Sequence, residues 1–141
     1  MALHFSEAEL TERRRRACAA MAAQNLDGLL MFRQESMYYL TGYDTQGFVY
    51  FQCLVMTADG RSILLTRSAD MRQAAYTSNI EDVRIWVDRD GADPYGELRE
   101  ICRELGLEGK RVGIELEAYG LTGRSWERLK PALEDFCRLE D

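Results

Sequence analysis

The spacing of apolar and polar residues changes repeatedly between a helical and a strand period along this chain. A capping box over residues 6–9 predicts the start of a first helix, which runs to about Asn25. Leu10, Ala17 and Met21 form the apolar stripe of this helix and are expected to be buried. Because the same change of period recurs to the end of the chain, we expect helices and strands to alternate.

Six short segments have the apolar pattern of strands: residues 28–32, 47–56, 61–66, 82–87, 111–116 and 136–139. The run over residues 47–56 is rich in Phe, Val and Tyr and predicts the longest strand. A tight turn at Thr57–Gly60 then predicts a hairpin with the next strand. In the fourth segment, the alternation of Val83, Ile85 and Val87 predicts that these three side chains point inward.

Between the strands the pattern favours short helices, over residues 35–40, 68–76, 94–105 and 122–131. The first is expected to end at Gly42. Asp93 as N-cap and Pro94 at the first helical position open the third, and Pro131 stops the last. The order of elements predicts a single α/β domain over residues 1–141, with three α/β/α layers around a mixed sheet of about six strands.

Charge and composition narrow the function classes. The chain has 141 residues with 18 Lys and Arg against 24 Asp and Glu, a net charge of −6, which argues against nucleic acid as a partner. No apolar run reaches about 18 residues, so no membrane span is expected, and the acidic first residues do not resemble a signal peptide. Four widely spaced cysteines, at positions 18, 53, 102 and 137, are expected to be reduced thiols in a cytoplasmic protein.

Residues for common catalytic chemistry are scarce. His4 is the one histidine, so a Ser-His-Asp triad or a histidine-ligated metal site would depend on it alone. The sequence contains no Walker A motif, G-x-G-x-x-G motif or nucleophile elbow. We therefore expect no catalytic residue, metal or cofactor in this chain.

Two charged groups are open to alternative interpretations. Glu115 and Glu117 follow a predicted strand and are candidates for an acid/base pair or a metal clamp; alternatively, they satisfy nearby backbone donors. Arg13–Arg16 is a candidate phosphate or nucleic-acid site. Consecutive helical residues point in different directions, however, so a solvated helix surface is favoured.

The stretch from Tyr38 to Phe51 has an unusual density of aromatic residues. On the predicted long strand, alternation puts Phe48 and Tyr50 on one face, with Val49 and Phe51 on the other. An aromatic strand most often packs in a core, but an exposed set of aromatic side chains indicates a site for a partner or ligand.

Three motifs in this order resemble those of a known family. Met37–Tyr43 is similar to the signature N-x-x-Y-L-T-G-Y/F of the N-terminal domain shared by creatinase, prolidase and aminopeptidase P. Leu64–Arg67 resembles the strand of that family ending in T-R, and Arg111–Glu115 resembles its k-x-v-G-x-E strand. The resemblance implies a creatinase N-terminal-like fold, which is related to ribonuclease H.

The resemblance also implies a function. Family members join this domain to a C-terminal pita-bread catalytic domain, which residues 1–141 lack and which binds two divalent metal ions (Mn, Co or Zn) in the peptidases. They form homodimers in which the N-terminal domain helps to shape the partner's substrate pocket. By position, the pocket rim falls on Tyr43, Asp44, Phe48 and Tyr50. Creatinase has an arginine near the place of Tyr50, so an Xaa-Pro peptide or another small amide is favoured over creatine.

The expected function is therefore that of the non-catalytic N-terminal domain of a cytoplasmic, homodimeric Xaa-Pro dipeptidase or aminopeptidase. The alternative is a stand-alone α/β ligand-binding or regulatory module, with the Tyr and Phe residues contacting the ligand. A reading frame that continues past Asp141 into a catalytic domain supports the first, and a stop codon there supports the second.

Overall fold

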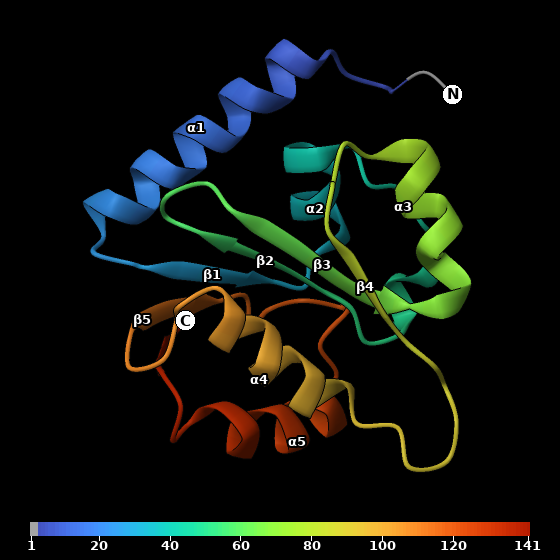
Figure 1. Ribbon diagram of the computed structural model, residues 1–141, viewed down its shortest axis with the longest axis vertical. Coiled ribbons are helices and arrows are strands. Elements are labelled where there is room, and N and C mark those ends of the chain that lie inside the picture. The colour runs from blue at the N-terminus through green and yellow to red at the C-terminus, as the bar shows by residue number, and fades with distance from the viewer. Residues whose placement is uncertain (1–2) are drawn as a thin grey trace.

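The computed structural model describes residues 3–141, and it contains one mixed sheet (Figure 1). The strand order is β4-β3-β2-β1-β5-β6. β2 runs antiparallel to both of its neighbours, and the other strand pairs are parallel. The strands are β1 Gly28–Met31, β2 Cys53–Thr57, β3 Ser62–Arg67, β4 Val83–Trp86, β5 Arg111–Ile114 and β6 Arg138–Glu140.

Helices cover both faces of this sheet. They are α1 Glu7–Ala23, α2 Gln34–Thr41, α3 Met71–Thr77, α4 Pro94–Glu104 and α5 Gly123–Leu133, with 3-10 turns at Gly47–Val49 and Ser68–Asp70. The predicted caps are present: Ser6 accepts a hydrogen bond at the start of α1, and Asp93 does so at the start of α4. Figure 1 shows α1, α2 and α3 on one side of the sheet, with α4 and α5 on the other.

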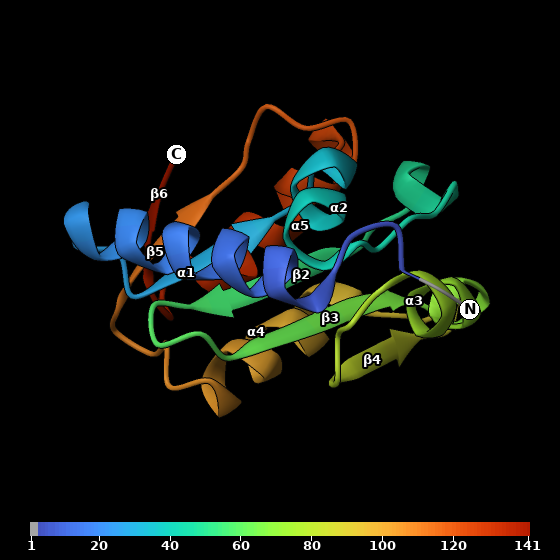
Figure 2. The ribbon, with the colours of Figure 1, turned by 90° about the horizontal axis from the view of Figure 1, so that it is seen from above.

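Alternation along the strands sends side chains into two separate cores. In β2, Cys53 and Val55 belong to the core under α4 and α5, whereas Leu54 and Met56 belong to the core under α1, α2 and α3. Viewed from above, α1 lies across the strands on its own side of the sheet (Figure 2). The predicted three-layer α/β/α architecture with a six-stranded mixed sheet is confirmed.

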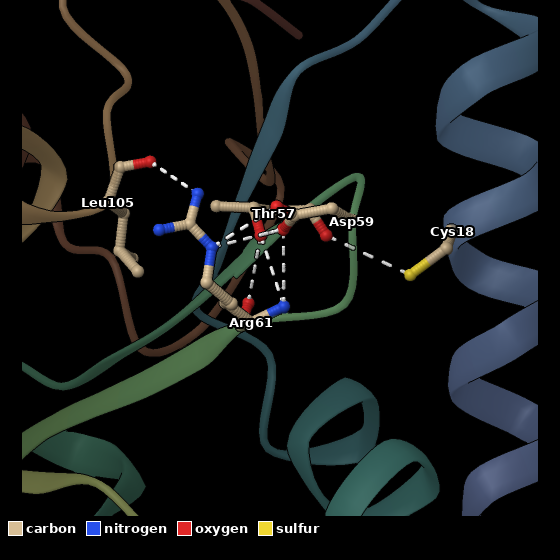
Figure 3. Close-up of polar contacts among 5 residues, drawn as sticks. All are labelled: Cys18, Thr57, Asp59, Arg61 and Leu105. Atoms are coloured by element: carbon tan, nitrogen blue, oxygen red, sulfur yellow. Dashed lines mark hydrogen bonds and ion pairs between the residues drawn. The ribbon is translucent and has the colours of Figure 1, made fainter.

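The predicted turn between β2 and β3 is also present. Gly60 has φ +94°, a left-handed conformation that suits glycine. The Thr57 hydroxyl donates a hydrogen bond to Asp59, and Arg61 reaches both Asp59 (3.2 Å) and the carbonyl of Leu105 (3.2 Å), as Figure 3 shows. These contacts tie the hairpin to the end of α4.

The predicted long strand over residues 47–56 is wrong in its first half. The hydroxyl of Thr45 donates to the carboxylate of Asp70 (2.8 Å) and accepts from the backbone N–H of Gly47 (2.9 Å). Gly47 lies so close to Asp70 that a Cβ on it would come within 2.4 Å of that carboxylate. This side-chain chemistry turns the backbone before the strand, so β2 begins only at Cys53.

The prediction that Val83, Ile85 and Val87 all point inward holds only for Val83, which packs against the core under α1, α2 and α3. Ile85 and Val87 are 41% and 48% exposed, whereas Trp86 is buried. The Trp86 indole N–H donates to the carbonyl of Phe51 at 2.9 Å. Because only one alternate set of β4 side chains faces α4, the large indole with a buried hydrogen-bond acceptor takes the inner position.

The prediction that Pro131 ends the last helix is wrong too. α5 continues to Leu133, which is fully buried in the core shared with α4. The missing N–H of Pro131 leaves one carbonyl without its helical donor, and burial of Leu133 offsets that loss. The last strand likewise begins two residues later than predicted, at Arg138.

Gly42 and Gly60 offer a matched test of local packing. Both have positive φ, but a Cβ on Gly42 would lie 2.7 Å from the carbonyl oxygen of Thr77, whereas Gly60 has open space around it. We expect Gly60→Ala to cost about 1 kcal/mol and Gly42→Ala about 3 kcal/mol or more in free energy of unfolding, measured by urea denaturation. Equal losses in the two variants would contradict the crowding at Gly42.

Candidate functional site

The candidate site lies at the carboxyl ends of β1 and β5, where the chain leaves these two neighbouring strands toward opposite faces of the sheet. β1 and β5 are parallel neighbours, but α2 follows β1 onto one face of the sheet and α5 follows β5 onto the other. In open α/β sheets, such a reversal at the carboxyl ends of strands forms a crevice in which ligands bind. A groove of about 840 Å³ lies there, lined by Arg33, Gln34, Glu35, Tyr38, Asp44, Phe48, Glu117, Ala118, Tyr119 and Gly120.

The Glu115 side chain connects the end of β5 to the start of α2. One carboxylate oxygen accepts the backbone N–H groups of Phe32 (3.0 Å) and Arg33 (3.1 Å), and the other accepts the hydroxyl of Ser36 (2.6 Å). Arg33 is the N-cap of α2 and its own side chain makes no capping hydrogen bond. A residue from β5's end therefore supplies the negative charge and acceptors at the start of α2.

Glu117 does not form a chemical pair with Glu115. Its side chain is almost fully exposed and lies 4.0 Å from the Arg33 guanidinium, which donates to the Glu117 carbonyl at 2.7 Å. Across residues 3–141 no group of three or more His, Cys, Asp or Glu side chains is arranged to hold a metal ion. The interpretation that these carboxylates satisfy backbone donors is confirmed for Glu115 by its bonds to Phe32 and Arg33. Among the described residues, the Glu117 carboxylate accepts no backbone N–H and faces only Arg33.

Tyr43, predicted on the pocket rim, is fully buried in this chain. Its hydroxyl donates to Gln52 Oε1 (2.9 Å) and lies 3.1 Å from the Thr66 hydroxyl. Gln34 donates to the Tyr43 carbonyl at 2.7 Å and accepts from the Gln52 amide at 3.2 Å. Burial raises the pKa of the Tyr43 phenol to about 12. Tyr43 thus supports the groove from behind and does not line it.

The other predicted rim residues are accessible. Asp44 and Phe48 line the groove, and Tyr50 lies outside it, with its ring 3.6 Å from the Arg67 guanidinium carbon. Phe48, Val49 and Tyr50 are all exposed, so the predicted alternation between two strand faces does not apply. We call residues 47–50 the aromatic turn.

A buried carboxylate holds the aromatic turn from β3's end. Asp70 accepts from Thr45 at 2.8 Å and from Arg67 Nε at 3.2 Å, and Arg67 in turn stacks on Tyr50. The interaction of a guanidinium with an aromatic face restricts the ring without covering it. The ring of Tyr50 is therefore held in place before any partner binds.

Sequence reasoning did not identify the far wall of the groove. Tyr119 is 90% exposed, and Gly120 beside it packs so closely that a Cβ would meet the Phe32 carbonyl oxygen at 2.5 Å. Tyr38, on the near wall, has its hydroxyl 2.8 Å from His4 Nδ1. The position of Tyr119 just after a predicted strand was an available signal, because ligand sites favour strand carboxyl ends.

The basic run on α1 is dispersed, as expected. Arg13 pairs with Glu9, and Arg15 and Arg16 both pair with Glu12 (2.7 and 3.2 Å). Arg14 points the other way and donates to the Asn79 side chain at 2.7 Å. These arginines therefore form no common phosphate-binding surface.

Comparison with known proteins decides the family. The profile of the creatinase/prolidase N-terminal domain matches residues 13–141. The chain belongs to this family. It is 36% identical over 138 residues to an uncharacterized hydrolase/peptidase of Sinorhizobium fredii, an alignment that covers 93% of this chain and 35% of the relative. The chain spans about a third of the length of the curated relatives it matches.

Solved structures share the fold of this creatinase/prolidase N-terminal domain. A proline dipeptidase from Streptococcus pneumoniae superimposes with a TM-score of 0.73 at 19% identity, over 92% of this chain and 90% of that one. The N-terminal domain of the cytoplasmic peptidase PepQ from Mycobacterium tuberculosis gives 0.67 at 23% identity, over 92% and 91%. The latter is a domain of this fold whose structure was solved without the rest of its protein.

The two glutamates provide a test of the capping contact. We expect Glu115→Ala to lower the free energy of unfolding by about 1–2 kcal/mol, because it removes the acceptor of three hydrogen bonds at the start of α2. Glu117→Ala, two residues on and exposed, should stay within about 0.5 kcal/mol of wild type. Equal effects in urea denaturation would show that Glu115 does not cap α2.

The raised pKa of Tyr43 predicts a loss of stability in alkali. Below pH 10, the ordinary value, the phenol is protonated in both folded and unfolded chains, and its contribution is fully present. As pH rises from 10 to about 12, the unfolded chain ionises first and stability falls. Tyr43→Phe should cost about 1 kcal/mol at pH 7 and should show a smaller loss between pH 9 and pH 11.5. Parallel pH profiles for the two proteins would refute this.

Proposed function

We propose that this chain acts as the N-terminal domain of an Xaa-Pro dipeptidase or aminopeptidase P-like hydrolase, with the catalytic groups on a separate C-terminal domain. The observation that carries the proposal is the family match over residues 13–141. Two further observations support it: the curated relatives are about three times as long, and one is named a hydrolase/peptidase.

The metal chemistry of such a hydrolase belongs to that second domain. Two divalent ions, Mn, Co or Zn, need carboxylate and histidine ligands held together. His4 contacts Tyr38, and Glu115 already accepts three hydrogen bonds, so the residues described here do not fit a metal pair. This chain's part in catalysis is therefore to position substrate and exclude water.

The groove and the aromatic turn are suited to positioning a substrate and excluding water. Phe48 and Asp44 line the groove, and Tyr50, two residues after Phe48, is exposed outside it. The contacts of Asp70 and Arg67 fix the turn in advance, which lowers the entropy cost of docking against a second surface. We propose that Asp44, Phe48 and Tyr50 complete the rim of the substrate pocket of the partner subunit in a homodimer, with Tyr43 supporting them from the core.

A reducing, cytoplasmic environment fits this proposal. All four cysteines are free thiols, three of them buried, and one similar structure belongs to a peptidase named as cytoplasmic. Buried thiols without partners are typical of proteins that stay in the cytosol. Among residues 3–141 no helix has the length and apolar character needed to cross a bilayer.

One observation favours the second candidate, a stand-alone binding module. The groove is complete within this chain, with aromatic and charged walls that need no other domain. A module of that kind binds its ligand as the isolated chain. The hydrolase proposal expects no hydrolysis and at most weak binding of Xaa-Pro dipeptides by this chain alone.

The decisive experiment measures hydrolysis of Xaa-Pro dipeptides by the protein that joins this chain to its catalytic domain. Phe48→Ala and Tyr50→Ala should each lower kcat/KM about ten-fold or more without changing bound metal, because they remove positioning contacts and not ligands. Tyr76→Ala, an equally exposed aromatic position on α3 outside the groove, should stay within about two-fold of wild type.

Two results would overturn the proposal. One is metal-dependent hydrolysis by the isolated chain that survives repurification. The other is kcat/KM unchanged in both Phe48→Ala and Tyr50→Ala. Tight binding of a small ligand by the isolated chain, with no hydrolase activity in the longer protein, would establish the binding module instead.

A further inference from the structure

The outer edge of the sheet at β4 carries two apolar side chains, Ile85 and Val87, that residues 3–141 leave about half exposed. β4 is the terminal strand of the sheet and pairs only with β3. Val83 packs against the core under α1, α2 and α3, whereas Ile85 and Val87, the latter one residue beyond the end of β4, are 41% and 48% exposed. The alternation of these apolar residues is typical of a strand with one buried face, yet Ile85 and Val87 are exposed.

In the described part of the chain, peptide groups on the outer side of β4 also have no neighbouring strand to bond to. The N–H of Leu64 donates to the carbonyl of Asp82 at 3.0 Å, and Leu64 is opposite Val83 in the parallel register. The peptide groups of Asp82 and Arg84 therefore point to β3, and those of Val83 and Ile85 point away from the sheet. Free donors and acceptors thus lie beside the exposed apolar side chains.

Edge strands of monomeric domains usually carry a lysine, a proline or a bulge at such positions, which prevents pairing with another strand. Ile85 and Val87 provide none of these. We propose that β4 pairs antiparallel with β4 of a second copy of this chain, about a two-fold axis at Trp86. The inference rests on the homodimer of the proposed function and identifies its surface.

Charge selects this register. With the axis at Trp86, Ile85 is opposite the partner's Val87, and Arg84 is opposite the partner's Asp88, each contact occurring twice by symmetry. With the axis at Ile85, Asp82 would instead be opposite the partner's Asp88, and like charges directly opposite are unfavourable. Arg84 is already oriented by Asp82 (2.6 Å) and Glu104 (2.9 Å).

This pairing places the second copy near the aromatic turn. Trp86 is opposite Arg67 in the register of β3 and β4, and Arg67 stacks on Tyr50. Trp86 also donates to the carbonyl of Phe51, next to the turn. A neighbour at β4 therefore lies at the same end of the sheet as the residues proposed to reach a partner's pocket.

Pairing of one short strand buries less than the roughly 1,200 Å² of a stable interface, so covalent trapping suits the test. Ile85→Cys and Val87→Cys are made separately in the full chain carrying Cys18→Ser, since the other native thiols are buried. Opposed residues bring their Cα atoms to about 5.5 Å, within disulfide range, and the diagonal 85–85 and 87–87 pairs do not.

A mixture of the two variants should form disulfide-linked dimers at least ten-fold faster than either alone, and faster than Glu127→Cys, an exposed control position on α5, away from β4 and the aromatic turn. Adding Asp88→Arg should slow the mixture several-fold, because it puts like charges opposite Arg84, whereas the neighbouring Asp90→Arg should not. A mixture no faster than its components, or equal slowing by Asp90→Arg, would overturn the proposal. The readout is independent of hydrolysis, so an inactive full-length protein would refute the proposed function without changing this result.

Discussion

The carboxylate of Glu115 is the contact on which the shape of the candidate site depends. It lies after β5 yet accepts the backbone N–H groups that open α2 after β1, so one side chain fixes both sides of the point where the sheet divides. Gln34 at the start of α2 then reaches the carbonyl of Tyr43 and the amide of Gln52. Through these contacts, the position of α2 sets the position of the chain that leads into the aromatic turn.

The turn is held a second time from the opposite side. Thr45 and Arg67 both donate to Asp70, and Gly47 is the residue small enough to approach that carboxylate. A buried carboxylate with several donors is strongly oriented, because any displacement leaves polar groups unpaired at low dielectric. The domain thus combines a rigid polar support with an exposed aromatic surface.

Much of the fold was predictable because it follows from local chemistry. Capping at Ser6 and Asp93, the glycine turn at Gly60 and the alternation in β2 all depend on residues near in sequence. The errors have distant causes. The turn at Gly47 depends on Asp70, 23 positions away along the printed sequence, and the outward face of β4 depends on the Trp86 indole finding Phe51. For the site, the family motif led to Asp44 and Phe48, and the strand end before Tyr119 was a signal for the far wall. The burial of Tyr43, in contrast, depends on its contacts with Gln52 and Thr66, which the sequence does not show.

The proposed function requires that the groove and the aromatic turn face a second protein surface in the longer protein. Hydroxyl-radical footprinting, comparing this chain alone with the protein that also carries the catalytic domain, tests it directly, since modification rates follow the exposure of aromatic rings. The account predicts that Phe48, Tyr50 and Tyr119 are modified several-fold more slowly in the longer protein, while Tyr76 on α3 is unchanged. Equal rates at Phe48, Tyr50 and Tyr119 in both proteins would contradict it.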